Sequence, residues 1–353
     1  MNQTTSQILS LTNEAAILLQ RGRVSYANAA ACKLLGADCV GKSTQSLLGQ
    51  DVAGFQASSF VADIPLSKRS CIVRVSRLEE GQVAFLHCPD LAPDIVNDPF
   101  LYELRSGLMN INMAADRLRE AAEQLGSQTM LSDLQSLTRS HYRLLRLIGN
   151  TSLLLSASRD SLPCAPRPMN LSSACRSLLE TVALFYPGLQ YRADLEENLT
   201  LTADPALVRQ LLLNLLSNCL VHAGPDCQIS ISLLSSPSSV VLSVSDDGQG
   251  IPPELLHTVF DRYRYGFSLS QLDRGSGLGL TVARIITMAH GGTLLLESQP
   301  GRGTTVRASL SRPLPDRVRL SAPDSEADTL VRDVLIGLAD CLPPDCYTER
   351  YLD

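Results

Sequence analysis

Two long stretches with a heptad repeat of apolar residues constrain the fold of this chain more than any other feature. Their apolar positions alternate at spacings of three and four, which is the seam of a coiled coil or a helical bundle. The positions are Leu101, Leu104, Leu108, Ile111, Ala115, Leu118, Ala122 and Leu125 in the first stretch, and Leu134, Leu137, His141, Leu144, Ile148, Thr151 and Leu155 in the second. A turn near Gly126 and Ser127 separates the two helices. Because two helices with one seam each bury little surface, we expect two copies of the chain to form a four-helix bundle, and therefore a homodimer.

Breaks in this pattern divide the chain into four parts. Pro-Asp-Leu-Ala-Pro-Asp at 89–94 and the segment around Pro163, Pro166 and Pro168 are typical of linkers. We therefore expect a multidomain α+β protein with a small α/β unit, a helical hairpin, a larger α/β domain and a tail. The predicted boundaries are 1–92, 93–160, 161–312 and 313–353.

The tail after Pro313 contains an amphipathic helix. Ser325 and Asp328 suggest a capping box at its start. One apolar face is formed by Leu330, Val331, Val334, Leu335 and Leu338. This face predicts docking on the chain's own domain or on a partner.

The composition argues against nucleic acid and membrane partners. The formal net charge is −6, the isoelectric point is about 5.5, and Lys and Arg are scattered, so no basic patch is offered to a phosphate backbone. No apolar stretch reaches the roughly 18 to 20 residues that span a bilayer, and the N-terminus lacks the basic and apolar regions of a signal peptide. We therefore expect a cytoplasmic protein.

The chain has ten cysteines, none of them in a C-x-x-C pair, and this predicts reduced thiols. Its five histidines are dispersed along the sequence, and this predicts no zinc site.

Residues 1–92 contain four strand-like runs, which are AAILLQ, GRVSYAN, SCIVRVSRL and QVAFLH. Residues 22–49 predict a strand, a helix opened by Asn28, and a loop punctuated by Gly36 and Gly41. This order resembles the start of a PAS sensor domain and implies a small-molecule sensor. A plain packing or dimerisation module fits the same pattern equally well.

A helix predicted after Asp204 carries two amides inside an apolar body. Asp204 as N-cap and Pro205 at the first helical position start the helix, and its body is apolar almost all round, so we expect it to be buried. Asn214 and Asn218 lie four residues apart on one face, and buried amides need partners. Their oxygens suit a Mg²⁺ ion, bound directly or through water. A pair of amides that satisfy backbone groups fits as well.

The stretch SVVLSVSDDGQGIP at 239–252 predicts a strand that ends in an acidic turn. Side chains alternate between the two faces of a strand, so Val240, Leu242 and Val244 lie on one apolar face. Asp246 continues the same alternation, and its carboxylate is therefore expected on that inward face. An inward-facing carboxylate needs a donor. The exocyclic amine of adenine is a fitting one, whereas guanine presents an acceptor at the same place. Gly248 and Gly250 remove side chains where a base would approach the backbone. A common Asp-Gly turn is the other interpretation.

The stretch DRGSGLGLTVARIITMAHGG at 273–292 places three glycines before a helix that a Gly-Gly pair closes. Such a helix offers free N–H groups and the positive end of its dipole to a phosphate. A dinucleotide-binding Rossmann motif is excluded, because the preceding residues are polar and Leu280 stands where the sixth position requires glycine.

These three stretches follow one another in the chain and are accompanied by FDRYRY and by GRGT at 301–304. Together they resemble the ATP-binding catalytic domain of sensor histidine kinases over residues 165 to 312. That domain is an α/β sandwich of the Bergerat type. The resemblance implies ATP and Mg²⁺ as cofactors, Asn218 as a Mg²⁺ ligand with Asn214 beside it, and Asp246 as the residue that reads adenine. Val221 departs from the family, in which many members carry Lys or Arg near the phosphates. The further nucleotide-binding residues that it implies are His222, Gly248, Gly250, Tyr263, Gly275, Gly277, Leu278, Gly279, Leu280 and Thr304, under a mobile lid at 264–274.

The predicted hairpin resembles the dimerisation and phosphotransfer domain of the same family, with one change. The family's phosphoacceptor motif is His-Glu-Leu-Arg-Thr-Pro-Leu, and this chain has YELRSGL at 102–108. A phenol, with a pKa of about 10, is a poor nucleophile near pH 7, whereas imidazole is a good one. Glu103 is retained, and Ser106 keeps the hydroxyl that in the family orients a water for dephosphorylation of a receiver partner. Gly107 is expected to weaken the helix locally, as the family's proline does.

His141 is the one histidine of the predicted hairpin. Folding the hairpin about residue 127 places His141 level with Met113, eleven residues or about 16 Å along the axis from Tyr102. We therefore expect it to pack in the bundle and not to replace the acceptor.

These features predict a two-component-type sensor histidine kinase homologue that binds ATP and Mg²⁺ and signals to the receiver domain of a response regulator. Autophosphorylation is expected to be lost or greatly reduced, and signalling to proceed through conformation or phosphatase action. The alternative is a non-catalytic ATP-binding pseudokinase scaffold. A serine-directed kinase on the same ATP-binding fold is disfavoured by the hairpin and the sensor-like front.

Overall fold

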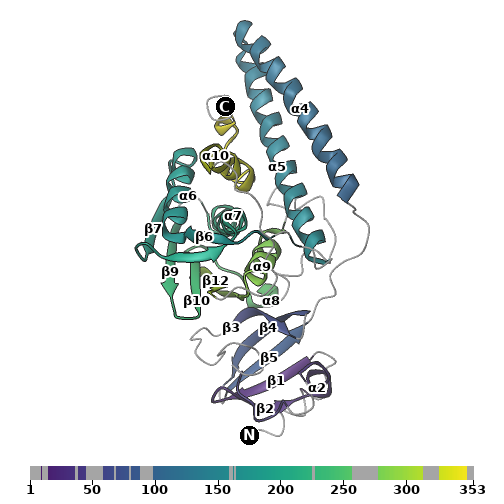
Figure 1. Cartoon of the computed structure of the whole chain (residues 1–353), viewed down its shortest axis with the longest axis vertical. Coiled ribbons are helices and arrows are strands. Elements are labelled where there is room, and N and C mark those ends of the chain that lie inside the picture. Colours follow the sequence, from purple (N-terminus) through teal and green to yellow (C-terminus); the bar gives the residue numbers. More distant parts are fainter. Residues whose placement is uncertain are drawn as a thin grey trace.

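The computed structural model describes residues 9, 15–35, 39–44, 59–66, 69–78, 81–87, 98–158, 162, 164–224, 227–256, 277–312 and 326–347. A small sheet module near the N-terminus lies at one end of the elongated molecule, and a long helical hairpin projects at the other (Figure 1). An α/β domain lies between them. No helix among these residues is long and apolar enough to cross a membrane.

The hairpin consists of α4 (Asp98–Gln124) and α5 (Gln128–Ser158). The predicted turn is confirmed, since Gly126 adopts a φ of +64° that favours glycine. Helix α4 runs through Gly107 without a break, so the expected local weakening is not visible in its course. Arg119 donates to Thr138 at 2.9 Å and fixes the register of the two helices.

The heptad positions of the hairpin separate into two stripes. Leu101, Leu108, Ala115 and Ala122 are buried and pack against α5, where Leu134, Ile148 and Leu155 are buried. The other stripe is exposed and consists of Leu104, Ile111, Leu118 and Leu125 on α4 with Leu137 and Leu144 on α5. One stripe therefore joins the two helices, and the other leaves an apolar face uncovered.

The N-terminal module is an antiparallel sheet with the strand order β2-β1-β5-β4-β3. Its elements are β1 (Ala15–Gln20), β2 (Arg23–Ala27), α2 (Ala29–Leu35), β3 (Ser59–Leu66), β4 (Arg69–Leu78) and β5 (Gly81–His87). Asn28 opens α2 as predicted, because its Oδ1 accepts from the backbone N–H of Ala31 at 2.9 Å and of Ala16 at 3.1 Å. Strand β3 was not among the predicted runs. Gly41 lies in the loop that follows α2, whereas Gly36 lies outside the described residues.

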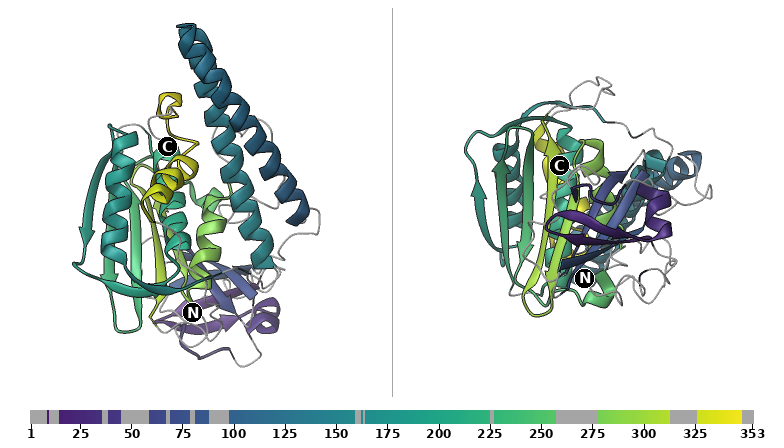
Figure 2. Two further views of the ribbon diagram at one scale, coloured as in Figure 1. Left: turned by 45° about the horizontal axis from the view of Figure 1, so that its top comes forward. Right: turned by 90° about the horizontal axis from the view of Figure 1, so that it is seen from below.

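The α/β domain has the strand order β11-β12-β10-β9-β7, with α6, α7 and α9 on one face of the sheet (Figures 1 and 2). Its strands are β7 (Gln190–Leu195), β9 (Gln228–Ser235), β10 (Ser239–Asp246), β11 (Leu294–Gln299) and β12 (Gly303–Ser311), and β6 (Arg167–Asn170) pairs separately with β8 (Thr200–Ala203). Its helices are α6 (Leu171–Phe185), α7 (Pro205–His222), α8 (Pro253–Leu256) and α9 (Gly279–Ala289). The two predicted hairpins, β9–β10 and β11–β12, are confirmed.

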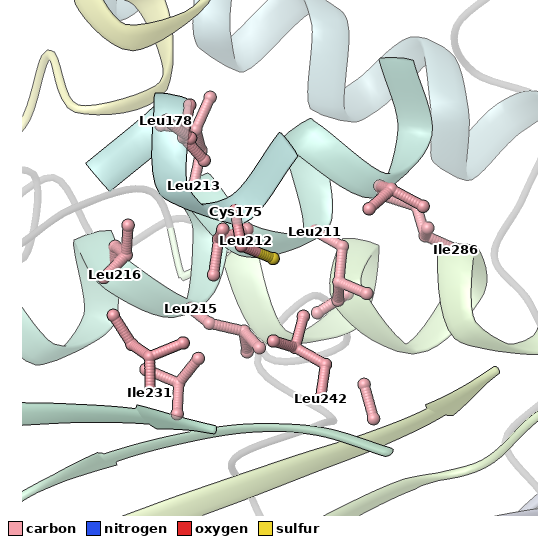
Figure 3. Close-up of a cluster of buried hydrophobic side chains, with 14 of the residues drawn as sticks. Cys175, Leu178, Leu211, Leu212, Leu213, Leu215, Leu216, Ile231, Leu242 and Ile286 are labelled. Atoms are coloured by element: carbon pink, nitrogen blue, oxygen red, sulfur yellow. The ribbon is translucent and has the colours of Figure 1, made fainter. Parts of the chain in front are cut away.

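Helix α7 forms the centre of the main core. Asp204 caps it by accepting from the N–H groups of Ala206 at 2.9 Å and Leu207 at 3.1 Å, an arrangement that stabilises a helix by about 1 kcal/mol. Leucines on its opposite sides are buried, as the apolar circumference predicts (Figure 3). Figure 3 shows Leu215 near Leu242 of β10, and Leu213 near Leu178 of α6. The core therefore holds α7 rigidly between the sheet and the outer helix.

One sheet runs through both the N-terminal module and the α/β domain. Strand β3 pairs antiparallel with β11, from Asp63 opposite Leu294 to Phe60 opposite Glu297. The result is a continuous ten-stranded sheet. Main-chain hydrogen bonds therefore connect the two parts, which the sequence did not predict.

The C-terminal segment is α10 (Glu326–Gly337) followed by η4 (Pro344–Cys346). Val334, Leu335 and Leu338 of the predicted apolar face are buried in the main core, so this helix docks on its own chain. The segment contacts α5, α6 and α7, and Arg209 of α7 binds Asp333 at 2.9 Å. The predicted cap residue Ser325 lies outside the described residues.

Candidate nucleotide-binding site

A cavity of about 390 Å³ lies beside α7, the end of β10 and the start of α9. This volume is in the range of roughly 300–1,000 Å³ that is usual for small-molecule sites. Eight of the predicted site residues line it, namely Asn218, His222, Asp246, Gly250, Gly277, Gly279, Leu280 and Thr304. Asn214 and Leu278 adjoin these residues without being part of the lining, and Tyr263, Gly275 and the lid at 264–274 lie outside the described residues.

Asp246 is the last residue of β10 and its carboxylate reaches the cavity. Its Oδ1 accepts from the N–H of Gly248 at 3.0 Å and from that of Thr304 at 3.2 Å. Burial raises the pKa of this carboxyl, and the two backbone hydrogen bonds oppose the rise. A side-chain hydrogen bond with Cys219 also opposes the rise. A carboxylate has about four lone-pair sites, so the group keeps acceptor capacity for a ligand that donates an N–H.

Asn214 and Asn218 direct their side-chain oxygens at one point. Both Oδ1 atoms lie 3.3 Å from the position that a Cβ atom on Gly279 would take. Asn214 donates to the carbonyl of Gln210 at 2.9 Å, and the Nδ2 atom of Asn218 is buried and has no partner among the described residues. Amide oxygens that converge in this way suit a hard cation such as Mg²⁺. A side chain at position 279 would require both oxygens to move by a few tenths of an ångström.

The start of α9 is open toward the cavity. Its N-cap residue, Leu278, makes no side-chain capping bond. Gly277, with a φ of +67°, makes the turn into the helix. The N–H groups at the start of a helix and the helix dipole together suit an anion.

Gly248 and Gly250 have a structural reason that differs from the predicted one. A Cβ on Gly248 would lie 2.4 Å from the Cα of Ala223, and a Cβ on Gly250 would lie 2.1 Å from the carbonyl oxygen of Gln299. Both glycines are therefore required by close packing of the protein backbone, and this requirement needs no bound base. Gly250 lines the cavity, and Gly248 is not part of its lining.

Three further predicted positions border the cavity. Thr304 bonds Ser298 through the two hydroxyls at 2.9 Å. The carbonyl of His222 accepts from Gln249 at 3.1 Å, and the side chain of Val221 contributes apolar lining where a basic residue is usual in the resembled family.

Arg146 and Asp340 also line the cavity, and sequence reasoning missed both. Arg146 comes from α5 and Asp340 follows α10, so two segments outside the α/β domain reach the site. Their ion pair measures 2.6 Å between Nη1 and Oδ2, and Nη2 of Arg146 donates to Oδ1 of Asn214 at 3.3 Å. Arg146 lies off the apolar seam of α5, and no local pattern marks either residue.

The residues at the phosphoacceptor position lie elsewhere. Tyr102, Glu103 and Ser106 are exposed on α4, with Tyr102 72% exposed, and none of the three lines the cavity. His141 is buried near Asp116, which is farther from Tyr102 than the predicted level of Met113. Burial lowers the pKa of His141, as suits a packed neutral imidazole.

Comparisons with known proteins agree with the chemistry of the cavity. Residues 203–314 match the family described as histidine kinase-, DNA gyrase B- and HSP90-like ATPase. The chain is 35% identical over 162 residues to the probable sensor histidine kinase TcrY of Mycobacterium tuberculosis, which is 45% of this chain and 34% of that protein. It is 30% identical over 212 residues to the sensor histidine kinase ZraS of Escherichia coli, which is 58% of this chain and 42% of that protein. The chain thus spans less than half the length of these two relatives.

A solved structure of the ATP binding domain of PrrB from Mycobacterium tuberculosis is 24% identical in sequence to the aligned part of this chain. The alignment covers 42% of this chain and 98% of that domain, and its TM-score is 0.35. The matched residues 203–314 include every described residue of the cavity lining except Arg146 and Asp340. The chain therefore contains an ATPase domain of the histidine kinase type and is a homologue of the sensor histidine kinases.

Proposed function

We propose that this chain binds ATP with Mg²⁺ in the cavity between α7, β10 and α9 and signals to the receiver domain of a response regulator. The observation that carries the proposal is the half-buried Asp246, which lines the cavity and whose carboxylate has one oxygen held by two backbone N–H groups. The match to a histidine kinase-type ATPase over residues 203–314 supports it.

Asp246 selects adenine in this proposal. Its carboxylate accepts from the exocyclic amine of adenine, whereas guanine presents a carbonyl oxygen at that place and is repelled. A buried acceptor left facing another acceptor costs roughly 1–3 kcal/mol, which is enough to discriminate the two bases.

Asn214 and Asn218 hold the metal end of the nucleotide. Their converging oxygens are the donors that Mg²⁺ prefers, and the ion would neutralise charge on the phosphate groups. The start of α9, where Gly279 and Leu280 line the cavity, lies at the same end and would contribute N–H donors to the phosphates.

We propose that autophosphorylation on α4 is lost or greatly reduced, because Tyr102 stands where the resembled family has its acceptor histidine. Glu103 and Ser106 are exposed on the same helix, so a receiver domain has access to both. Ser106 would orient a water for the dephosphorylation of that receiver, a reaction that requires no histidine.

The exposed stripe from Leu104 to Leu125 on α4, with Leu137 and Leu144 on α5, supports a homodimer. A continuous apolar face of this length is unusual on a monomer, and a second hairpin packed against it completes a four-helix bundle. The N-terminal module, with its five-stranded antiparallel sheet and the helix after β2, supports a PAS-like sensor, which we place with the rest of the chain in the cytoplasm.

A non-catalytic ATP-dependent scaffold is the second candidate, and Tyr102 is the observation that favours it. The two candidates differ in phosphate chemistry. Purified chain is incubated with γ-labelled ATP and then with phosphorylated receiver domains. Faster loss of receiver phosphate with the wild type than with Ser106→Ala supports the phosphatase. Nucleotide-dependent thermal stabilisation without any change in receiver phosphate supports the scaffold, and acid-labile label on the chain itself overturns the proposed loss of autophosphorylation.

A further inference from the structure

The charge of the cavity does not match its proposed ligand if the α/β domain is considered alone. The phosphate groups of a nucleotide carry several negative charges, and the cavity lining already contains the carboxylates of Asp246 and Asp340. Among the described residues of the lining, Arg146 is the one Lys or Arg side chain. In the described part of the chain, the cation that lines the cavity therefore comes from the helical hairpin.

The guanidinium of Arg146 is held in place and keeps donors to spare. The side chain is 7% exposed, donates to Asp340 through Nη1 and to Asn214 through Nη2, and its Nε is buried without a partner in the described part of the chain. A guanidinium has five N–H donors in a rigid fork. Buried donors that lack an acceptor carry a cost, and an anion in the cavity relieves it.

Asp340 does not cancel the positive charge of this group. Its Oδ2 binds Arg146 at 2.6 Å and its Oδ1 binds Nε of Arg143 at 3.0 Å, so one carboxylate is shared by two guanidinium groups. Because this carboxylate is divided between two guanidinium groups, it neutralises Arg146 only in part, and a ligand with negative charge complements the remainder.

Arg146 stands at the end of the cavity where phosphates are expected. It contacts Asn214, whose Oδ1 lies 3.3 Å from the Cβ position of Gly279 at the start of α9. Asp246 at the end of β10 marks the adenine end.

We propose that Arg146 binds the phosphate groups of the nucleotide from helix α5 and so provides the cation that Val221 does not. Asp340 acts as the positioning residue that aims the guanidinium. This inference rests on the proposed function of the cavity. A nucleotide bound in this way joins the helical hairpin to the ATPase domain of the same chain.

The test compares the affinities of the full-length wild type and of Arg146→Gln for ATP, ADP and adenosine by calorimetry in the presence of Mg²⁺. Losing charge-assisted hydrogen bonds weakens ATP and ADP binding about ten- to a hundredfold, and adenosine binding stays unchanged. Arg139→Gln is the matched control. Arg139 lies on the same helix and donates to the carbonyls of Ala339 and Asp340 at 3.3 and 3.2 Å, yet is not part of the cavity lining. An equal loss of ATP affinity in Arg139→Gln would mean that only the docking of the C-terminal segment matters, and would overturn the inference.

Two further variants test whether Arg146 binds the phosphate groups or instead obstructs the cavity. Arg146→Lys keeps the positive charge but loses the planar guanidinium donors, so its affinity for ATP falls less than that of Arg146→Gln. If Arg146→Gln does not fold, Arg146→Lys is compared with the wild type in its place. Asp340→Asn frees the guanidinium from its position and weakens ATP binding severalfold with adenosine unchanged. Tighter ATP binding in Arg146→Gln or Arg146→Lys would show that Arg146 blocks the site, and would contradict the proposal.

Failure of this inference differs from failure of the proposed function. If the wild type binds ATP and adenosine, Asp246→Asn loses both, and Arg146→Gln binds all three ligands as the wild type does, then the cavity is a nucleotide site and Arg146 is no ligand. If the wild type binds none of the three, the proposed function and this inference both fall. The melting temperature of each variant without nucleotide checks its fold.

Discussion

The ATPase domain holds the side chains that a nucleotide site needs, whereas the helical hairpin departs from the motif that it resembles at the reacting residue. In the former, Asp246 and Asn218 line one cavity beside a leucine-rich core, and the side-chain oxygens of Asn214 and Asn218 converge next to Gly279. In the latter, Tyr102 stands exposed where an imidazole is expected. The difference teaches that recognition of a nucleotide and acceptance of its phosphoryl group are separate properties, and that one chain can keep the first without the second.

The largest expected effect comes from restoring the acceptor. Tyr102→His places an imidazole beside Glu103 on the exposed side of α4, where a carboxylate is available to take its proton. We expect acid-labile label from γ-labelled ATP to rise from background to a clear signal in this variant. Tyr102→Phe is the control and stays at background. Label in the wild type as strong as in Tyr102→His would remove the distinction between the two regions.

A second test concerns the exposed stripe of the hairpin. Leu118→Glu puts a charge in the middle of the proposed dimer face, where burial of an unpaired carboxylate is strongly unfavourable. We expect light scattering to report a monomer in place of a dimer. Met113→Glu is the matched control, because Met113 is also exposed on α4 but lies off the stripe. If the wild type is a monomer at micromolar concentration, the dimer proposal fails.

A smaller effect is expected where the C-terminal segment joins the two regions. The hydroxyl of buried Tyr347 donates to the carbonyl of Leu335 at 3.1 Å, and its ring lies 5.2 Å from that of Tyr142 on α5. Tyr347→Phe removes one buried hydrogen bond and should lower the free energy of unfolding by about 1 kcal/mol. Urea denaturation measures this change, and an unaltered midpoint would mean that the bond contributes nothing.

The smallest effect is a dependence of stability on pH at Asp246. Burial raises the pKa of this carboxyl above its unfolded value of 3.8, so the ionised form is disfavoured in the folded chain. Its contribution therefore becomes more favourable as the pH falls from above the folded pKa toward the unfolded one. Without nucleotide at pH 7, Asp246→Asn should melt slightly higher than the wild type, and the gap should close below pH 4. A lower melting temperature at pH 7 would show that the charge stabilises the fold.

Much of the candidate site was readable from local sequence because its signals lie within single elements. Asp204 and Pro205 mark the start of α7, the four-residue spacing puts Asn214 and Asn218 on one face, and strand parity carries Asp246 inward. Each of these relations spans only a few residues. The backbone packing that requires Gly248 and Gly250 involves Ala223 and Gln299, which lie far away in sequence, and so the sequence did not predict this reason for the two glycines.

The parts that could not be predicted depend on contacts between distant segments. Strand β7 lies at an edge of the sheet and is exposed along most of its length, so it shows no apolar alternation. The apolar face of α10 was visible, but not the surface that covers it. The approach of Arg146 and Asp340 to the cavity joins positions 194 residues apart. Likewise, the pairing of β3 with β11 leaves no trace in either strand alone.

The most direct test of the account is a calorimetric titration of the full-length chain with ATP and Mg²⁺, side by side with Asp246→Asn and with Asp247→Asn as an exposed neighbouring control. The account predicts saturable binding to the wild type and to Asp247→Asn, and a loss of more than about a hundredfold in affinity in Asp246→Asn. No heat of binding in the wild type, or equal affinities in all three proteins, would contradict it.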